Sequence, residues 1–356
     1  MADRKLLREL TEAFGPSGFE DEAAAIVARE LGKSGELQRD GLGSVVCKVP
    51  GKSDRPRIMI SAHMDEVGFL VRSVTADGYI RFLPVGGWWS QVLLGQRVVV
   101  RTRKGDFPGV IGTRPPHELS EEEAKKIPEI DKMFIDVGCS EGFDVKKELA
   151  VRPGDPIVPQ SPFTELAGGL LMGKAWDDRG GCGILIELAR QISDGRHPNT
   201  TYLVGSVQEE VGLRGARTAA EVVQPDVAIA LDVSLCGEHP DRSRKDVEER
   251  LKNGAAILVH DRTMIPNTVL RDFAIDMAET HSIKYHLTSV RGGYDTGMIH
   301  LHRSGVPSVV VGWPTRYIHG HAGIIACDDY DAVVQLLTVI VRSLDETVSG
   351  KLRFRS

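Results

Sequence analysis

CxxC cysteine pairs, basic clusters and long apolar runs are all missing from this chain of 356 residues. Its five cysteines are widely scattered, which argues against a zinc knuckle and against a disulfide framework. No block of Lys and Arg offsets the formal net charge of −6, which argues against nucleic acid as the main partner. The longest apolar stretches, such as VPSVVVGW at 306–313, are too short to span a membrane.

What is present suits a large globular protein of the cytoplasm. An apolar fraction of 41% over this length can fill a sizeable core in more than one lobe. The first ten residues, MADRKLLREL, are charged, so we expect no secretory signal.

The spacing of apolar residues predicts two kinds of domain. Short Val-rich segments separated by Gly, Pro and Asp run from about 66 to 160, which is the spacing of a small β-barrel or sandwich. After this region, helical and strand patterns alternate, and before it RPRIMISAH reads as a strand buried on both faces. We therefore predict an α/β fold with a mostly parallel sheet, interrupted by a small β domain. The predicted ranges are 1–66 and 164–356 for the α/β domain and 67–163 for the insertion.

Acidic residues and histidines gather where the predicted strands end and at one Gly-rich helix entry. In an α/β sheet, ligands bind at the carboxyl ends of the strands. The residues are His63 and Asp65, Asp177 and Asp178, Glu209 and Glu210, Asp232, and His319 and His321. Because so many carboxylates repel one another, they predict bound cations, and the mixed imidazole and carboxylate ligands favour zinc, cobalt or manganese over calcium. Two ions that share a carboxylate would also generate a reactive hydroxide near neutral pH.

The spacing within two of these motifs predicts different roles for neighbouring residues. Strand alternation puts His63 and Asp65 on the same side, so Asp65 can orient a ligating imidazole. For Glu209 and Glu210, either alternation sends the side chains different ways, or a bend just past the strand lets both approach the metals. In both cases one glutamate can bind metal while the other acts as a base.

Five motifs resemble, in order and character, those of the tetrahedral aminopeptidases, a family of dinuclear metallopeptidases. They are SAHMDEVGFLV, GKAWDDRGGCG, VQEEVGLRGA, ALDVS and GVPSVVVGWPTRYIHGHAG. Weaker matches at PSGFEDEA, VIGTRPPHEL and GGYDTG extend the resemblance over nearly the whole chain. The resemblance implies a zinc-exopeptidase-like catalytic domain with two divalent metal ions, zinc or cobalt.

The same resemblance implies a role for each matching residue. His63 and Asp232 would hold one ion, Glu210 and His319 would hold the other, and Asp177 would bridge both. Glu209 would be the general base, and Asp65 would orient His63. The substrates would be peptides with free N-termini. The inserted domain would mediate dimer contacts, and six dimers would form a tetrahedral dodecamer.

Two motifs depart from the family pattern, and one further residue has an open role. Tyr294 stands where Thr is common before the aspartate of GGYDTG, and the bulkier phenol would reshape the substrate pocket. Gly320 and His321 follow His319 where Ser-Pro is common, and we favour His319 as the ligand. Asp178 either supports its turn or bonds a group behind the metal ligands.

Two other functions compete with the aminopeptidase. A glycosidase would use paired carboxylates as acid and base, yet it gives His63, His319 and Asp232 no role. An inactive metal-binding assembly subunit is disfavoured because the base Glu209 is intact. A related question is Trp88-Trp89, which suits a sugar-binding platform, although we favour packing at the domain junction or at a dimer contact.

Overall fold

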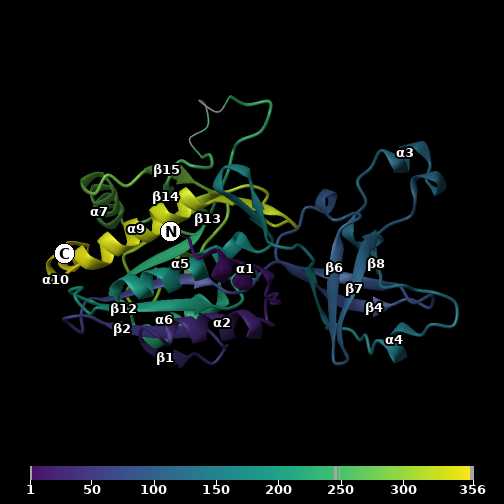
Figure 1. Cartoon of the computed structure of the whole chain (residues 1–356), viewed down its shortest axis with the longest axis horizontal. Coiled ribbons are helices and arrows are strands. Elements are labelled where there is room, and N and C mark those ends of the chain that lie inside the picture. Colours follow the sequence, from purple (N-terminus) through teal and green to yellow (C-terminus); the bar gives the residue numbers. More distant parts are fainter. Residues whose placement is uncertain (1, 244–246, 248, 353–356) are drawn as a thin grey trace.

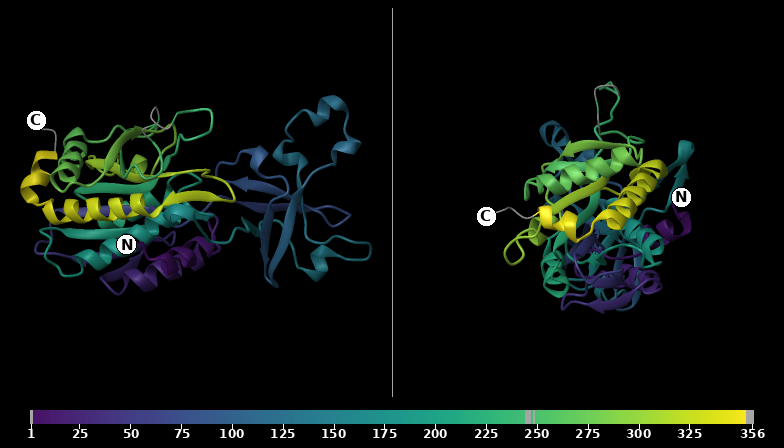
Figure 2. Two further views of the ribbon diagram at one scale, coloured as in Figure 1. Left: turned by 45° about the horizontal axis from the view of Figure 1, so that its top comes forward. Right: turned by 90° about the vertical axis from the view of Figure 1, so that its left-hand side faces the viewer.

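The structure, a computed structural model, describes residues 2–243, 247 and 249–352. An eight-stranded sheet forms the centre of the larger part of the molecule, and a closed barrel projects from one side of it (Figures 1 and 2). The strand order is β1 (Glu36–Arg39), β2 (Val45–Pro50), β12 (Thr200–Ser206), β3 (Arg57–His63), β13 (Val227–Leu235), β16 (Ser308–Thr315), β14 (Ala255–His260) and β15 (Tyr285–Ser289). The central strands β12, β3, β13 and β16 run parallel, and β2 and β14 flank them in antiparallel pairing. The predicted α/β fold with a mostly parallel sheet is confirmed.

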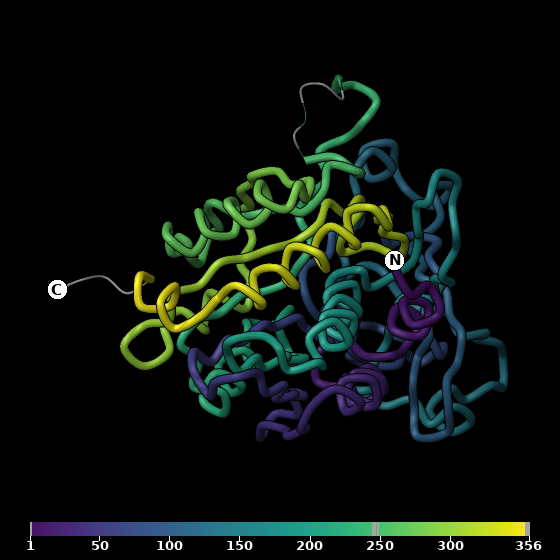
Figure 3. The backbone as a smooth tube through the Cα atoms, turned by 60° about the vertical axis from the view of Figure 1, so that its left-hand side comes forward, coloured from purple at the N-terminus to yellow at the C-terminus, as the bar shows by residue number. Residues whose placement is uncertain are grey.

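Apolar side chains on both faces of the central strands explain why the sheet lies between two helical layers. In β3 every residue from Ile58 to His63 is buried. Ile58 and Ile60 belong to one core and Met59 to another, as strand alternation requires. The first core includes residues of α1 (Arg4–Glu12), α2 (Asp21–Leu31), α5 (Trp176–Ile192), α7 (Thr268–Thr280) and α9 (Cys327–Ser343). The second includes residues of α6 (Arg214–Val223) and α8 (Thr296–Ile299), and Figure 3 shows α5 and α9 side by side.

The barrel has a hydrophobic core of its own, which includes Phe69 and Ile157. Its strands are β4 (Gly68–Val74), β5 (Ile80–Val85), β8 (Phe134–Asp136), β7 (Gly105–Gly112), β6 (Arg97–Thr102) and β9 (Pro156–Pro159). All of these pairings are antiparallel, so the small β domain predicted between the two α/β segments is a barrel. The strands lie inside the range 67–163 that the sequence predicts for the insertion.

The remaining elements are short or lie at the margins. A three-stranded sheet joins β10 (Thr164–Leu166), β11 (Leu170–Gly173) and β17 (Gly323–Ala326). The other α-helices of the described residues are α3 (Glu121–Ala124), α4 (Val145–Glu148) and α10 (Glu346–Leu352), and short 3-10 helices lie at Ser90–Val92, Pro116–Glu118, Ile130–Lys132 and Ala167–Gly169. Across the described residues, no helix combines the length and the apolar character that a bilayer crossing needs. The outer limits of the predicted α/β ranges, residue 1 and residues 353–356, lie outside the described part.

A buried glutamate in α2 provides a test of how the helices of the first layer are held together. The Glu30 carboxylate accepts hydrogen bonds from Lys33, Arg29 and Arg190, the last of which lies in α5. The hydrogen bond from Lys33 is the largest cause that lowers the pKa of Glu30 from 4.5 to about 2.

We expect Glu30→Gln to lower the free energy of unfolding at pH 7 by about 1 kcal/mol, because the three cations are largely exposed. A depressed carboxyl pKa contributes stability above the unfolded-state pKa, and this stability is lost as the pH falls through the folded-state value. The difference from the parent should therefore shrink between pH 5 and pH 2. Thermal unfolding at several pH values measures it, with the exposed Glu36→Gln as the matched control. A difference that stays constant with pH would contradict the assignment.

Candidate metal centre

The carboxyl end of β3 places a histidine and an aspartate at the centre of the sheet edge. His63 is the last residue of β3 and is 1% exposed. Its Nδ1 lies 3.1 Å from the main-chain oxygen of Asp65 and 3.4 Å from Asp65 Oδ1. The shorter contact to the imidazole is therefore made by the carbonyl of Asp65 rather than by its carboxylate.

The Asp65 carboxylate also holds the neighbouring loop that carries the two glutamates. The backbone N–H groups of Glu209 and Glu210 donate to its two oxygens at 3.0 and 3.1 Å. The hydroxyl of Ser17 donates to the same carboxylate at 2.6 Å. Ser17 belongs to the weakly matching PSGFEDEA segment, and its sequence neighbours gave no sign of this contact.

A bend after β12 determines the directions in which the side chains of Glu209 and Glu210 point. The strand ends at Ser206, and Gln208 has a φ of 56°, in the left-handed region. Glu209 and Glu210 therefore lie beyond the bend, and strand alternation does not separate their side chains. Glu210 approaches His319, whereas the Glu209 carboxylate lies 4.0 Å from His63 and accepts no hydrogen bond from any residue that the structure describes.

The entry to α5 contributes two aspartates with different contacts. Asp177 and Asp178 have non-helical backbone angles, and the regular helix follows them. The Asp178 carboxylate is fully buried and accepts hydrogen bonds from the backbone N–H of His63, at 2.9 Å, and of Gly181, at 3.1 Å. A Cβ at Gly181 would lie 2.4 Å from Asp178 Oδ1, which explains a glycine there. Asp178 thus supports the main chain of His63, and Asp177 is left to face the site.

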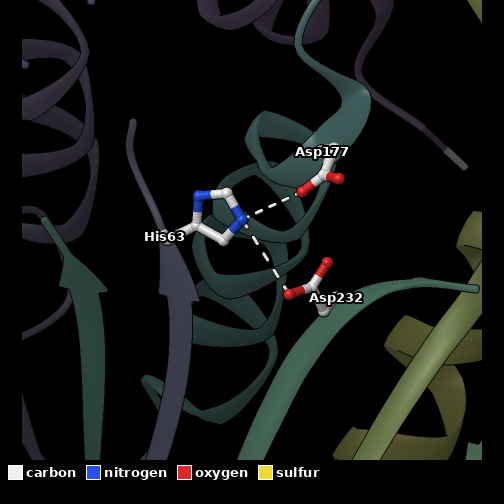
Figure 4. Close-up of side chains that lie close together, drawn as sticks. All are labelled: His63, Asp177 and Asp232. Atoms are coloured by element: carbon white, nitrogen blue, oxygen red, sulfur yellow. Dashed lines mark hydrogen bonds and ion pairs between the residues drawn. The ribbon is translucent and has the colours of Figure 1, made fainter. Parts of the chain in front are cut away.

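The side chains form two groups that share Asp177. His63 Nε2 lies 2.9 Å from Asp177 Oδ1 and 3.8 Å from Asp232 Oδ2, and Figure 4 shows the three side chains converging from β3, from the entry to α5 and from β13. On the other side, His319 Nε2 lies 3.2 Å from Asp177 Oδ2 and 3.3 Å from Glu210 Oε1. Each group offers three ligand atoms within 4.8 Å of one another. Asp177 therefore presents one carboxylate oxygen to each group.

Burial makes this concentration of carboxylates unfavourable without cations. Burial raises the pKa of Glu209 well above its usual range, and the nearby Asp232 raises it further. Burial likewise raises the pKa of Asp232, together with the charge of Asp177. Burial alone lowers the pKa of His319, but Asp177 and Glu210 raise it to about 11. All three raised pKa values favour the protonated side chains. A bound divalent cation would favour the deprotonated forms and so lower these pKa values.

The donor atoms fit divalent metal ions. When Nδ1 of His63 donates to the Asp65 carbonyl, a neutral imidazole turns the lone pair of Nε2 toward Asp177 and Asp232. A lone pair facing carboxylates requires a proton or a cation between them. Glu210 Oε1 is also buried and accepts no hydrogen bond of normal geometry. Imidazole with carboxylate is a ligand set that zinc and cobalt accept.

His321, Tyr294, Trp88 and Trp89, which the sequence also singled out, lie outside both groups. His321 is buried and faces Trp88, with ring centroids 5.8 Å apart, and takes no part in either group. Tyr294 is buried and donates its hydroxyl to the Val233 carbonyl oxygen at 2.9 Å, so the phenol packs beside Asp232. Trp88 packs at the junction, as favoured, while Trp89 is 61% exposed.

Comparison with known proteins gives one consistent answer. The family model described as M42 glutamyl aminopeptidase matches residues 43–336. The glutamyl aminopeptidase of Lactococcus lactis is 36% identical over 344 residues, which cover 95% of this chain and 96% of that protein. The structure of a TET aminopeptidase from Thaumarchaeota archaeon SCGC AB-539-E09 is 44% identical, with a TM-score of 0.94 and 98% of each chain covered. The Pyrococcus horikoshii TET1 peptidase, which can assemble into a tetrahedron or a large octahedral shell, is 29% identical, with a TM-score of 0.84 and coverage of 96% and 99%.

Proposed function

The chain belongs to the M42 glutamyl aminopeptidase family, and from this premise we propose that it removes N-terminal residues from peptides through two divalent metal ions and a glutamate base. The family makes it a metal-dependent peptide hydrolase; the number of ions, their ligands and the base are our proposal. The observation that carries the proposal is the position of the Asp177 carboxylate between the two groups. One of its oxygens faces His63, and the other faces His319.

Five residues of the chain would bind the two ions. His63 and Asp232 would hold one ion and Glu210 and His319 the other, each with one oxygen of Asp177. When bound, such ions polarise the scissile carbonyl and lower the pKa of the attacking water. Zinc and cobalt both suit these ligands.

Glu209 is the residue best placed to move the proton. Its carboxylate is close to His63 but engages no hydrogen-bond donor among the described residues, so it is free to accept the proton of the attacking water. The same carboxyl can then protonate the departing amine, so that the base is regenerated in each cycle. At 9% exposure, Glu209 is shielded from most of the bulk solvent that would compete for this proton.

Removal of the metal tests the proposed function directly. We expect the purified full chain to hydrolyse aminoacyl-nitroanilides, to lose this activity on dialysis against a chelator, and to recover it with zinc or cobalt. Carboxymethylcellulose should remain intact throughout, because a glycosidase leaves the two histidines of the site without a role. Undiminished peptidase activity after complete metal removal, or cellulose cleavage alone, would overturn the proposal.

We also propose that the chain self-associates in the cytoplasm, as dimers that assemble into a tetrahedral dodecamer. The Pyrococcus horikoshii relative, with nearly full mutual coverage, supports such an assembly. The five free cysteines suit a reducing compartment. Light scattering of the purified protein measures the assembly, and a monomer at micromolar concentration would contradict it.

A further inference from the structure

The two candidate metal-binding histidines are held in place by different means. His63 is buried, and its Nδ1 contacts the Asp65 carbonyl at hydrogen-bond distance. The side chain of His319 is 34% exposed, and its Nδ1 has no hydrogen-bond partner among the described residues. A ligating histidine normally has its second ring nitrogen fixed by such a partner. No described side chain or carbonyl fixes His319 through its Nδ1, so packing contacts behind the ring can contribute to its orientation.

The contact behind His319 comes from the barrel. The segment after β5 passes so close to the site that a Cβ at Gly87 would lie 3.1 Å from His319 Nδ1 and 3.4 Å from its Cε1. A Cβ at the preceding Gly86 would lie 3.1 Å from Glu210 Oε2. Gly86 also has a φ of +77°, which favours glycine. Gly86 and Gly87 of the barrel therefore lie against Glu210 and His319, two candidate ligands of the same metal-binding group.

The next residue anchors this segment. The Trp88 indole stacks on Phe69 of the barrel core, with ring centroids 4.6 Å apart and planes at 22°. Its Nε1 donates to the Gly68 carbonyl oxygen at 2.9 Å. The indole also lies near the ring of His321, in the loop that carries His319, with centroids 5.8 Å apart. The loop has left-handed backbone angles at Tyr317 and His319, which surrounding contacts must maintain.

We infer that Gly86, Gly87 and Trp88 of the barrel form a positioning segment for His319 and Glu210, so that the inserted domain completes the second metal-binding group of the catalytic domain. This inference rests on the proposed two-ion function. It assigns to the barrel a part in metal binding in addition to any part in assembly. The glycines are positioning residues, because they act through His319 and Glu210.

Gly87→Ala tests the inference with a small change. The added methyl requires the imidazole to move by a few tenths of an ångström, away from the position that serves Asp177 and Glu210. Loss of support behind a metal ligand costs about 10- to 100-fold in affinity. Titration of the metal-free full chain with cobalt chloride, followed by calorimetry and by visible absorption, should show two equivalents in the parent. In Gly87→Ala one equivalent should weaken about 10- to 100-fold and the other should be unchanged.

Further variants test whether the weaker cobalt binding of Gly87→Ala arises at the group that contains His319. Gly41→Ala is the control, because Gly41 has open space around its Cβ position and an ordinary φ. His319→Ala should abolish the equivalent that Gly87→Ala weakens. Trp88→Ala should weaken the same equivalent, and Trp88→Phe, which keeps an aromatic ring on Phe69, should restore part of it.

The outcomes separate the two hypotheses. A parent that binds a single cobalt equivalent overturns the proposed two-ion function. A parent that binds two, with Gly87→Ala indistinguishable from Gly41→Ala, overturns the positioning segment and leaves the two-ion function standing. Equal weakening of both equivalents, with a lower Tm of the metal-free variant, also overturns it, since that result indicates general disruption.

Discussion

Glu209→Gln is expected to lower kcat by about 10² to 10⁴-fold, the usual contribution of a positioned general base, while both metal equivalents remain. Gln keeps the size of the side chain but cannot take up a proton. The Glu209 carboxylate accepts no hydrogen bond from the described residues, so the substitution should disturb little else. Aminoacyl-nitroanilide turnover under saturating zinc measures kcat, and cobalt titration measures the metal content.

The neighbouring glutamate provides the matched control. Glu210→Gln removes a carboxylate that lies 3.3 Å from His319, so its main effect should be weaker binding of one ion. Excess metal should therefore restore part of the activity of Glu210→Gln and none of the activity lost in Glu209→Gln. If added metal rescues Glu209→Gln, or if the variant turns over like the parent, Glu209 is not the base.

Much of the arrangement could be predicted because each strand carries its own signal. The continuous apolar run that ends at His63 predicts a strand buried on both faces, and the structure has one there. The parallel arrangement of neighbouring strands then brings their carboxyl ends to one edge. This is why residues as far apart as His63 and Asp232 could be expected to meet.

Contacts that depend on backbone conformation or on another domain could not be predicted in this way. The choice between alternation and a bend at Glu209 and Glu210 depended on the left-handed angle of Gln208, for which the sequence has no glycine signal. The Asp65 carboxylate was expected to orient an imidazole, but it also binds two amides of the Glu209 loop and the Ser17 hydroxyl. Gly86 and Gly87 lie in the barrel, and apolar periodicity says nothing about how two domains touch.

Asp177→Asn should affect metal binding more than any other single change at the site. Asp177 is the one member common to both groups found among residues 2–243, 247 and 249–352. The amide carries no charge, and only one of its two terminal atoms can act as a ligand. We expect both cobalt equivalents to weaken by about 100-fold or more, since losing a ligand should cost more than the 10- to 100-fold that a lost supporting contact costs. Hydrolysis at micromolar metal should fall below detection.

Asp232→Asn separates the loss of a shared ligand from a general loss of charge, because each substitution removes one carboxylate from the site. Asp232 belongs only to the His63 group, so one cobalt equivalent should survive in that variant and neither in Asp177→Asn. Thermal unfolding gives a second readout: a metal at 100 times its Kd raises the free energy of unfolding by about 2.7 kcal/mol. The parent should show this stabilisation under conditions in which Asp177→Asn shows almost none. If Asp177→Asn retains one full-affinity equivalent, Asp177 does not bridge, and the two groups are independent sites.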